Sequence, residues 1–290
     1  MARLRISSTG STVAEPYAEV IGDPVAHSLS PTIHSYWLDY RDLPGSYRAM
    51  RCDAQALAPY LAGRRDDPLW RGCNVTMPLK ELAAARMDWL DDGAARAGAI
   101  NCVVPRDGEL HGYNTDIDAV LRAVETVDLA GKRAVVLGAG GVARAALVAL
   151  GARGAQRVVL ARNADRRLAL RALGADVQDA PLYAIREALE DAAVVINATP
   201  LGMAGDERID IFLLEALEAA ARPMLVIDMV YRPVETEFLS TARAIGMPTV
   251  DGLTLLIGQA RRSFSLLFGA EPPPWSGPLR ADLVSRLRAG

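Results

Sequence analysis

The stretch Ala134-Val-Val-Leu-Gly138-Ala-Gly140-Gly141-Val-Ala143 decides the fold of this 290-residue chain. It has the pattern of an apolar strand, a G-x-G-x-x-A turn and the start of a helix. Gly138 permits the tight turn, Gly140 lets the backbone approach a pyrophosphate, and Ala143 keeps helix and strand close together. The helix N-terminus adds free N–H groups and a partial positive charge. The stretch therefore predicts a dinucleotide-binding site formed by Gly138, Ala139, Gly140, Gly141 and Val142. The alternative is a glycine-rich turn that binds no ligand.

The end of the next predicted strand, residues 157–161, bears on the choice of nucleotide. An NAD site usually places Asp or Glu at this point, where it bonds the ribose 2′-hydroxyl. Here the strand ends on neutral Ala161, Arg162 follows directly, and Arg166 lies one helical turn further on. Two guanidinium groups suit a 2′-phosphate, so the segment favours NADP. A solvated arginine pair is the alternative, and Asp165 could form a salt bridge with either arginine.

Short apolar runs alternate with amphipathic stretches along the rest of the chain, which indicates an α/β fold. Strands are expected at 17–22, 47–52, 71–75, 134–137, 157–161, 194–197 and 224–229, a hairpin at 99–104 and 109–113, and helices at 31–40, 54–62, 79–90, 142–150 and 252–268. A helix at 114–126, entered through an Asn-Thr-Asp cap, crosses between two domains. We expect an N-terminal mixed α/β substrate domain of residues 1–114 plus 252–290, and a Rossmann-type dinucleotide-binding domain of residues 115–251.

The composition argues against several classes of protein. Hydrophobic residues make up 51% and charged residues 23% of the chain, an ordinary balance for a globular protein. A net charge of −3 and a pI of about 5.7 favour neither a nucleic-acid nor a membrane partner. The polar N-terminus lacks the apolar core of a signal peptide and no stretch reaches the ~20 apolar residues of a membrane span, so we expect a cytoplasmic protein. The cysteines contain no CxxC pair and indicate buried thiols rather than a disulfide framework; they are Cys52, Cys73 and Cys102.

A loop between the first strand and the first helix, residues 22–31, carries two hydroxyls, Ser28 and Ser30. Ser30 stands directly before a proline, so a simple N-cap is the alternative to a ligand contact. The histidines lack metal spacing such as H-E-x-x-H, and no metal site is expected; they are His27, His34 and His111.

Two more segments place polar side chains where open α/β sheets bind ligands, at the carboxyl ends of strands. Residues 74–80 bring Thr76 and Lys80 to such a point, although a lone lysine is often only a surface residue. Asn101 is a further polar residue of this kind. The Asn-Thr-Asp run that ends at Asp116 places a carboxylate at the start of a helix, where an N-terminal cap is the alternative to a ligand contact.

Together these segments resemble the shikimate dehydrogenase family over nearly the whole chain. The resemblance rests on eight motifs in order: H-S-x-S-P at 27–31, N-V-T-x-P-x-K at 74–80, G-A-I-N at 98–101, N-T-D at 114–116, G-A-G-G at 138–141, N-A-T-x-x-G-M at 197–203, D-x-x-Y-x-P-x-x-T at 228–236 and D-G-x-x-x-L-x-x-Q-A at 251–260. It implies an NADP-dependent oxidoreductase that reversibly reduces 3-dehydroshikimate to shikimate, on the route to chorismate and the aromatic amino acids.

The resemblance also implies a role for each matching residue. Lys80 is the catalytic acid/base and is paired with Asp116, because a carboxylate orients the ammonium group. The substrate-binding positions are Ser28, Ser30 and Tyr231 for the carboxylate, and Thr76, Lys80, Asn101, Asp116 and Gln259 for the ring. The cofactor-binding positions beyond the glycine turn are Arg162, Asn163, Arg166, Met229 and Gly252.

The sequence departs from the family pattern at a few points. Cys102 stands where threonine is usual, Ser35 where asparagine is usual, and Ile117 where glycine is usual. The usual Asn-Arg-Thr after the cofactor strand is Ala-Arg-Asn at residues 161–163. These changes keep alternatives open: an NAD-using quinate/shikimate dehydrogenase, a non-catalytic regulatory paralogue, or a related two-domain enzyme such as a folate dehydrogenase. We expect a small-molecule substrate and a monomer or homodimer.

Overall fold

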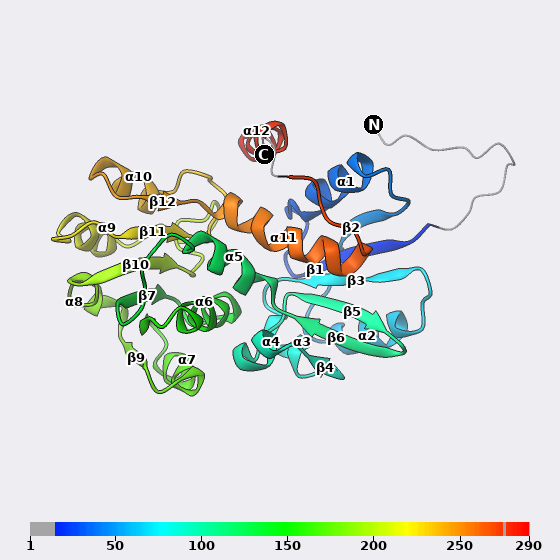
Figure 1. Ribbon diagram of the computed structural model, residues 1–290, viewed down its shortest axis with the longest axis horizontal. Helices are drawn as coiled ribbons and strands as arrows, with labels where there is room; N and C mark the ends of the chain where they lie inside the picture. Colours follow the sequence, from blue (N-terminus) through cyan, green and yellow to red (C-terminus); the bar gives the residue numbers. More distant parts are fainter. Residues whose placement is uncertain (1–14, 275–276, 290) are drawn as a thin grey trace, which may run out of the picture.

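The computed structural model describes residues 15–274 and 277–289, and it contains two sheets side by side (Figure 1). The first sheet is mixed: the three strands at one edge are parallel to one another and so are the two at the other edge, whereas the strand between them runs antiparallel to both of its neighbours. Its order is β2 (Ser46–Arg51), β1 (Tyr17–Gly22), β3 (Trp70–Val75), β5 (Cys102–Arg106), β6 (Glu109–Tyr113) and β4 (Trp89–Leu90).

The second sheet is parallel throughout. Its order is β12 (Thr249–Val250), β11 (Leu225–Asp228), β10 (Ala192–Asn197), β7 (Arg133–Leu137), β8 (Gln156–Leu160) and β9 (Val177–Ala180). Neighbouring residues pack into opposite layers, with Val135 in one core and Val136 in the other, as expected of a sheet covered on both faces. The order reverses direction between β7 and β10, the point where such sheets bind ligands. The predicted α/β class, with a mixed sheet and a Rossmann sheet, is confirmed.

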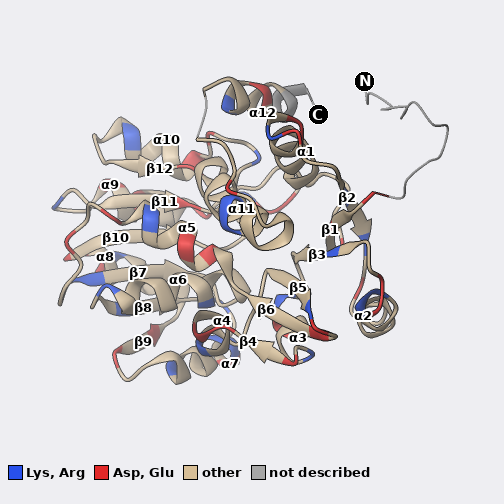
Figure 2. Cartoon of the chain, turned by 45° about the vertical axis from the view of Figure 1, so that its right-hand side comes forward, with Lys and Arg blue, Asp and Glu red and all other residues tan. Residues whose placement is uncertain are grey.

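Twelve α-helices occur in the described residues, and charged residues are spread over the helices, the strands and the connecting loops (Figure 2). They are α1 (Ser30–Tyr40), α2 (Leu57–Arg65), α3 (Lys80–Ala84), α4 (Asp92–Ala97), α5 (Thr115–Ala123), α6 (Gly141–Ala152), α7 (Ala164–Ala169), α8 (Ile185–Leu189), α9 (Ile211–Glu218), α10 (Glu237–Ala244), α11 (Gly252–Phe268) and α12 (Gly277–Ala289). Helices α5 and α11 pack against each other between the two sheets (Figure 1). Leu255 of α11 joins the core of the second sheet, and Phe264 packs with Ile33 and Trp37 of α1. The division of the domains at residues 114 and 252 stays a prediction.

The structure corrects the helix expected at 79–90. Helix α3 ends at Ala84, and residues 89–90 form β4 beside β6. Asp88 explains the change, because its N–H donates to the carbonyl of Leu110 at 3.0 Å and its carboxylate accepts the N–H of Leu110 at 2.7 Å. Pairing with β6 therefore overrides the helical pattern.

The helix expected at 54–62 also differs, because it begins at Leu57 and runs to Arg65. The Asp53 carboxylate accepts the N–H groups of Gln55 and Ala56 at 2.9 and 2.8 Å, which holds these residues in a turn. The short helices α4 and α7 to α10, with strands β9 and β12, had no sequence prediction, because their apolar runs are too brief to show a period.

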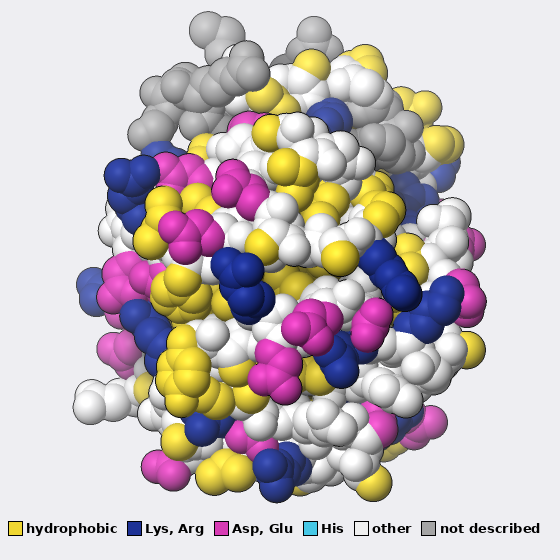
Figure 3. All heavy atoms as spheres, turned by 90° about the vertical axis from the view of Figure 1, so that its left-hand side faces the viewer, with side chains coloured by type: hydrophobic (Ala, Val, Ile, Leu, Met, Phe, Trp, Pro, Cys, Tyr) yellow, Lys and Arg dark blue, Asp and Glu magenta, His cyan; other side chains and the backbone are white. Residues whose placement is uncertain are grey.

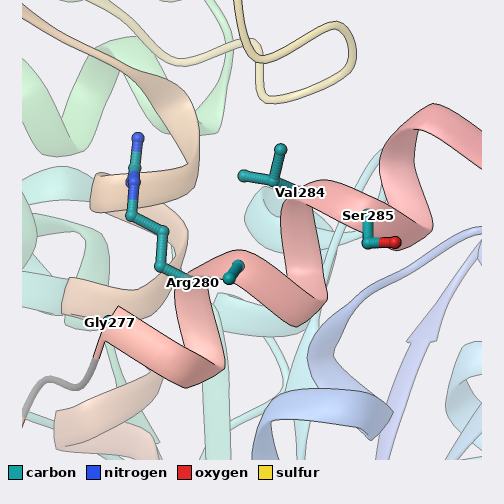
Figure 4. Close-up of a pocket in the computed structure, with 5 residues that line it drawn as sticks. Gly277, Arg280, Val284 and Ser285 are labelled. Atoms are coloured by element: carbon teal, nitrogen blue, oxygen red, sulfur yellow. The ribbon is translucent and has the colours of Figure 1, made fainter.

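The C-terminal helix α12 packs on the junction of α1 and α11. Its Leu279 and Leu283 lie in one core cluster with Trp37 and Leu253. A cavity of about 450 Å³ lies beside α12 (Figure 4), and none of its described lining residues belongs to the predicted site. The predicted site residues lie elsewhere, at and near the strand ends.

The charge distribution shows no single-sign field at the outer end of the second sheet, where acidic and basic side chains are interspersed (Figure 3). In the described residues, no helix is long and apolar enough to cross a membrane. No cluster of three His, Cys, Asp or Glu side chains in that part of the chain could hold a metal ion. The three cysteines are buried free thiols.

A buried carboxylate in β1 gives a stability prediction. Glu19 is fully buried and accepts hydrogen bonds from Arg48 (2.9 Å), Arg64 (3.1 Å) and Tyr60 (2.7 Å). Burial raises the pKa of Glu19, but these hydrogen bonds outweigh it and leave the pKa below its usual value. A carboxyl with a depressed folded pKa stabilises the protein above its unfolded pKa of about 4.3, and this contribution is lost as the pH falls through the folded pKa.

We expect Glu19→Gln to lower the free energy of unfolding by about 2 kcal/mol at pH 7, because charged hydrogen bonds to two guanidinium groups are lost. Urea unfolding at pH 7 and at about pH 3 measures the effect. The difference in unfolding free energy between the variant and the wild type should be smaller at the lower pH. Glu190→Gln, at an exposed position, serves as the control and changes little. A gap that stays constant over this range contradicts the ion-pair explanation.

Candidate active site

The centre of the site is an ion pair between Lys80 and Asp116. Lys80 begins α3 directly after the loop that follows β3, and Asp116 lies in the first turn of α5. The Lys80 ammonium donates a hydrogen bond to Oδ2 of Asp116, and the two side chains are only 12% and 14% exposed. The other carboxylate oxygen, Oδ1, accepts Nδ2 of Asn101 at 3.0 Å. Both oxygens of Asp116 are thus engaged, which fixes the position of the ammonium group.

Asn101 connects this pair to one further helix, α11, and to the first residue of α5. Its Oδ1 accepts the backbone N–H of Thr115 at 2.7 Å, and its Nδ2 donates to Oε1 of Gln259 at 3.3 Å. Gln259 lies on α11, and its Nε2 donates to the carbonyl of Leu256 at 2.8 Å, which orients its amide. Three helices and the segment before β5 therefore bring together four predicted residues: Lys80, Asn101, Asp116 and Gln259.

A buried polar chain behind these residues was not predicted as part of the site. Tyr47 donates to Oδ1 of Asn74 at 2.7 Å, and Asn74 donates to Oγ of Ser263 at 2.8 Å. The Ser263 hydroxyl lies 3.1 Å from that of Thr115. Asn74 and Thr115 belong to motifs and could have been chosen, whereas Tyr47 and Ser263 carry no sequence signal. The chain fixes β3 to α5 and α11, and thereby the frame of the site.

The two-serine loop lies at the start of α1. The N-cap of α1 is Leu29, so Ser30 does not cap the helix; its own N–H donates to Oγ of Ser28 at 3.3 Å. The alternative that Ser30 is a simple N-cap is therefore wrong, because the helix begins one residue earlier than a Ser30 cap requires. Tyr231 packs against the cluster that contains Leu29, and burial raises the pKa of its phenol. Two serine hydroxyls and a protonated phenol thus lie in one region.

His34, one turn further along α1, is fully buried and stacks on the Tyr47 ring at 4.1 Å. Burial lowers its pKa to about 3, so the ring is uncharged. Asn114 occupies the N-cap position of α5, but its side chain donates to the carbonyl of Ala99 at 2.8 Å rather than capping the helix as expected. Thr76 lies in the loop after β3, and its backbone N–H donates to the carbonyl of Ile21 at 2.9 Å.

The glycine turn joins β7 to α6 as the sequence predicts. Gly138 has a φ of +111°, and a Cβ there would lie 2.8 Å from the carbonyl oxygen of Ala198. At Gly140, no described heavy atom outside its immediate neighbours lies within 4 Å of a Cβ position, so the space in front of the turn is open. Gly140 is also the N-cap of α6, and as a glycine it leaves the first N–H groups of the helix without a side-chain partner. Open space and free N–H groups fit a pyrophosphate.

The glycine turn lies directly against the ion pair. A Cβ at Gly141 would lie 3.0 Å from Cβ of Lys80 and 3.3 Å from its Cδ. Arg144 on α6 holds the two parts together, since its Nη1 donates to the carbonyl of Ala97 at 3.1 Å and its Nε lies 3.4 Å from a Glu81 oxygen. Ile117, where the family has glycine, packs between α4 and α6 in this junction.

Met229 and Gly252 meet on the other side of the turn. The N–H of Met229 donates to the carbonyl of Asn197 at 2.9 Å, at the end of β10. A Cβ at Gly252 would lie 2.3 Å from the carbonyl oxygen of Val230 and 2.7 Å from that of Met229. The start of α11 therefore packs directly against the segment after β11. Strand β11 is paired with β10, and β10 is the neighbour of β7, the strand that leads into the glycine turn.

The arginines after β8 lie at the outer edge of the site. Arg162 donates to the Glu207 carboxylate at 2.6 Å, a partner that the sequence reasoning missed because Glu207 lies 45 residues away. Asn163 caps α7, as its Oδ1 accepts the N–H of Arg166 at 2.9 Å. Arg166 itself is exposed.

Comparisons with known proteins agree with this arrangement. The model of the shikimate dehydrogenase substrate binding domain matches residues 20–103, and that of shikimate / quinate 5-dehydrogenase matches residues 120–255. A shikimate dehydrogenase (NADP(+)) of Sphingopyxis alaskensis is 45% identical over 94% of this chain and 98% of its own length. The chain belongs to the shikimate dehydrogenase family.

Solved structures of other shikimate dehydrogenases have the same fold. The enzyme from Thermus thermophilus in complex with NADP(H) and shikimate aligns with a TM-score of 0.75 at 36% identity, covering 94% of this chain and 99% of that one. The enzyme from Listeria monocytogenes in complex with shikimate and NAD aligns with a TM-score of 0.82 at 27% identity, covering 97% and 99%. The two structures hold different nucleotides.

Proposed function

We propose that this shikimate dehydrogenase catalyses the reversible, NADP-dependent reduction of 3-dehydroshikimate to shikimate. The observation that carries the proposal is the contact between Gly141 and Lys80, because it sets a candidate acid beside a candidate dinucleotide turn. A ketone bound between them would be within reach of both. The relatives named for NADP support the choice of nucleotide.

The residues present fit the nucleotide. The open space in front of Gly140 and the N-terminal N–H groups of α6 suit the pyrophosphate, while Arg162 and Arg166 suit a 2′-phosphate. Met229 and Gly252 would lie beside the nicotinamide, and Asn163 supports Arg166 by capping its helix. When bound, NADPH supplies the hydride.

The chain's own residues bind the substrate and move the proton. Lys80 holds a proton on Nζ and gives it to the oxygen of the reduced carbonyl, while Asp116 keeps the ammonium group in place. Ser28, Ser30 and Tyr231 bind the carboxylate. The ring hydroxyls are bound by Thr76, Asn101, Asp116 and Gln259. The low exposure of the ion pair excludes water from the reacting atoms.

The proposed function is tested by initial rates of shikimate or quinate oxidation with NADP⁺ or NAD⁺. We expect the highest kcat/KM for shikimate with NADP⁺, because two arginines at the edge of the site favour the 2′-phosphate. Preference for quinate would overturn the substrate assignment. Preference for NAD⁺ by more than about tenfold, or ~1.4 kcal/mol, would overturn the cofactor assignment.

Two alternatives stay open to the same measurement. An NAD-using quinate/shikimate dehydrogenase is favoured by one observation, the Arg162–Glu207 pair, because Glu207 already occupies the arginine. A regulatory paralogue would bind NADP and shikimate without turnover, although the intact Lys80–Asp116 pair argues for chemistry. We further propose a cytoplasmic monomer or homodimer whose partners are small molecules rather than nucleic acid or membrane.

A further inference from the structure

The loop that carries Glu207 lies beside the dinucleotide turn. In the second sheet β8 and β10 are the two neighbours of β7, so the loops after them flank the turn at residues 138–141. Arg162 lies in the loop after β8, and Glu207 lies in the loop between β10 and α9. The salt bridge between them therefore connects the two loops on either side of the phosphate-binding turn.

The loop holds Glu207 by its own backbone. The carbonyl of Glu207 accepts the N–H of Gly202 at 2.8 Å, and its N–H donates to Oδ1 of Asp206 at 2.9 Å. Asp206 in turn donates its N–H to the carbonyl of Met203 at 3.0 Å. The Glu207 carboxylate is thus presented to Arg162 by a folded loop.

The Arg162–Glu207 pair is weak as a structural element. Nη1 and Oε2 are 2.6 Å apart, but each side chain is 62% exposed. An exposed ion pair contributes only about 0–1 kcal/mol to stability, because solvent screens it. Arg162 can therefore exchange Glu207 for another anion at little cost.

We propose that Glu207 is a specificity-determining residue that competes with the nucleotide 2′-phosphate for Arg162. The inference rests on the proposed function, since it takes Arg162 to be the 2′-phosphate contact. A 2′-phosphate carries a charge of about −2 and is repelled by a neighbouring carboxylate, whereas a free ribose diol can donate hydrogen bonds to it. Glu207 thus weakens NADP binding, leaves NAD binding intact, and narrows the discrimination between them.

The test compares nucleotide fragments by titration calorimetry. Glu207→Gln should raise the affinity for 2′,5′-ADP about three- to tenfold and change that for 5′-AMP less than about twofold, since only the former meets the lost charge. The gain should shrink as salt increases. Likewise, the KM for NADP⁺ should fall in this variant, whereas the KM for NAD⁺ should change less than about twofold.

Asp191→Asn is the matched control. Asp191 lies directly before β10, at the opposite edge of the same sheet, and forms an exposed pair with Arg222 at 3.4 Å. This variant loses the same charge from the same part of the chain, so it should leave the ratio of 2′,5′-ADP to 5′-AMP affinity at the wild-type value. A change as large as that of Glu207→Gln would show a general charge effect and overturn the proposal.

Two failures can be told apart. If Glu207→Gln leaves the fragment ratio unchanged, Glu207 does not set specificity, whatever reaction the enzyme catalyses. If the wild type oxidises shikimate with neither nucleotide, the proposed function fails, and the fragment ratio still decides the role of Glu207. Arg162→Gln completes the set: it should lower 2′,5′-ADP affinity and abolish the effect of Glu207→Gln in the double variant.

Discussion

Replacing Lys80 with methionine is expected to lower kcat about 10³-fold, because a general acid contributes roughly 10²–10⁴ in rate. The aliphatic part of methionine keeps the contact with Gly141, so the glycine turn at residues 138–141 should not move into the volume that the lysine side chain occupies. The other substrate contacts that we propose, from Ser28, Ser30 and Gln259, do not involve the ammonium group. We therefore expect KM for shikimate to change by less than about tenfold while kcat falls far more.

The control for this variant is unusually well matched. Lys132 is the only other lysine in the chain, and it forms an exposed pair with Asp128 at 2.9 Å. Lys132→Met removes the same charge and should leave kcat within about twofold, since exposed pairs contribute little. Turnover of the Lys80 variant within about tenfold of the wild type would show that another group donates the proton. Steady-state rates with shikimate and NADP⁺ give both values.

The ion pair itself shows how far sequence reasoning reaches. Lys80 and Asp116 were chosen from separate motifs 36 residues apart, and the structure brings them into contact because β3 and β6 both end at the same edge of the first sheet, where α3 and α5 begin. Such pairing is predictable, since the carboxyl ends of strands meet at one edge of a sheet. The parallel Rossmann sheet was predictable for a similar reason, as its uninterrupted β-branched runs are typical of strands buried on both faces.

What escaped prediction depends on contacts between distant segments. Ser263 is one polar residue on an otherwise regular helix, and only its position between Asn74 and Thr115 gives it a role. Glu207 lies in a loop without a motif, and its meeting with Arg162 follows from the order of β8, β7 and β10 in the sheet. Neither propensity nor spacing encodes these meetings.

The same reasoning explains the local errors. Ser30 looked like a cap because proline follows it, but the helix takes Leu29 as its N-cap and leaves the Ser30 hydroxyl for other contacts. Residues 89–90 joined a sheet because Asp88 pairs with Leu110. At residues 89–90, a tertiary contact outweighed a local helical preference of about 1 kcal/mol or less.

Replacing Gly252 with alanine is expected to cost at least about 3 kcal/mol of unfolding free energy. The added Cβ would lie 2.3 Å from the carbonyl oxygen of Val230, 2.4 Å from its carbonyl carbon and 2.7 Å from the carbonyl oxygen of Met229. All three are backbone atoms, so no side-chain rotation relieves the clash. The end of β11 and the start of α11 must instead move apart.

This movement should also impair catalysis, because Met229 lies on the displaced segment and Gln259 on the displaced helix. A shift near 1 Å between reacting groups can cost about 10²-fold in rate, so we expect kcat/KM to fall about 10- to 100-fold in the fraction that folds. Urea unfolding and steady-state rates at a temperature well below the transition measure the two effects separately.

Gly63→Ala tests whether the cost comes from this contact or from losing a glycine. Gly63 lies inside α2, and no described heavy atom outside its own helix surroundings lies within 4 Å of its Cβ position. Alanine there should raise stability by about 0.5–1 kcal/mol, since glycine disfavours a helix interior. The two substitutions are expected to change the unfolding free energy in opposite directions, because only Gly252 contacts backbone atoms of the segment after β11. This contact fixes the start of α11, the helix that extends from the Rossmann sheet to the polar residues around Lys80. A Gly252→Ala protein as stable and as active as the wild type would show that this junction is loose, and the nicotinamide contact assigned to Met229 and Gly252 would then have no structural support.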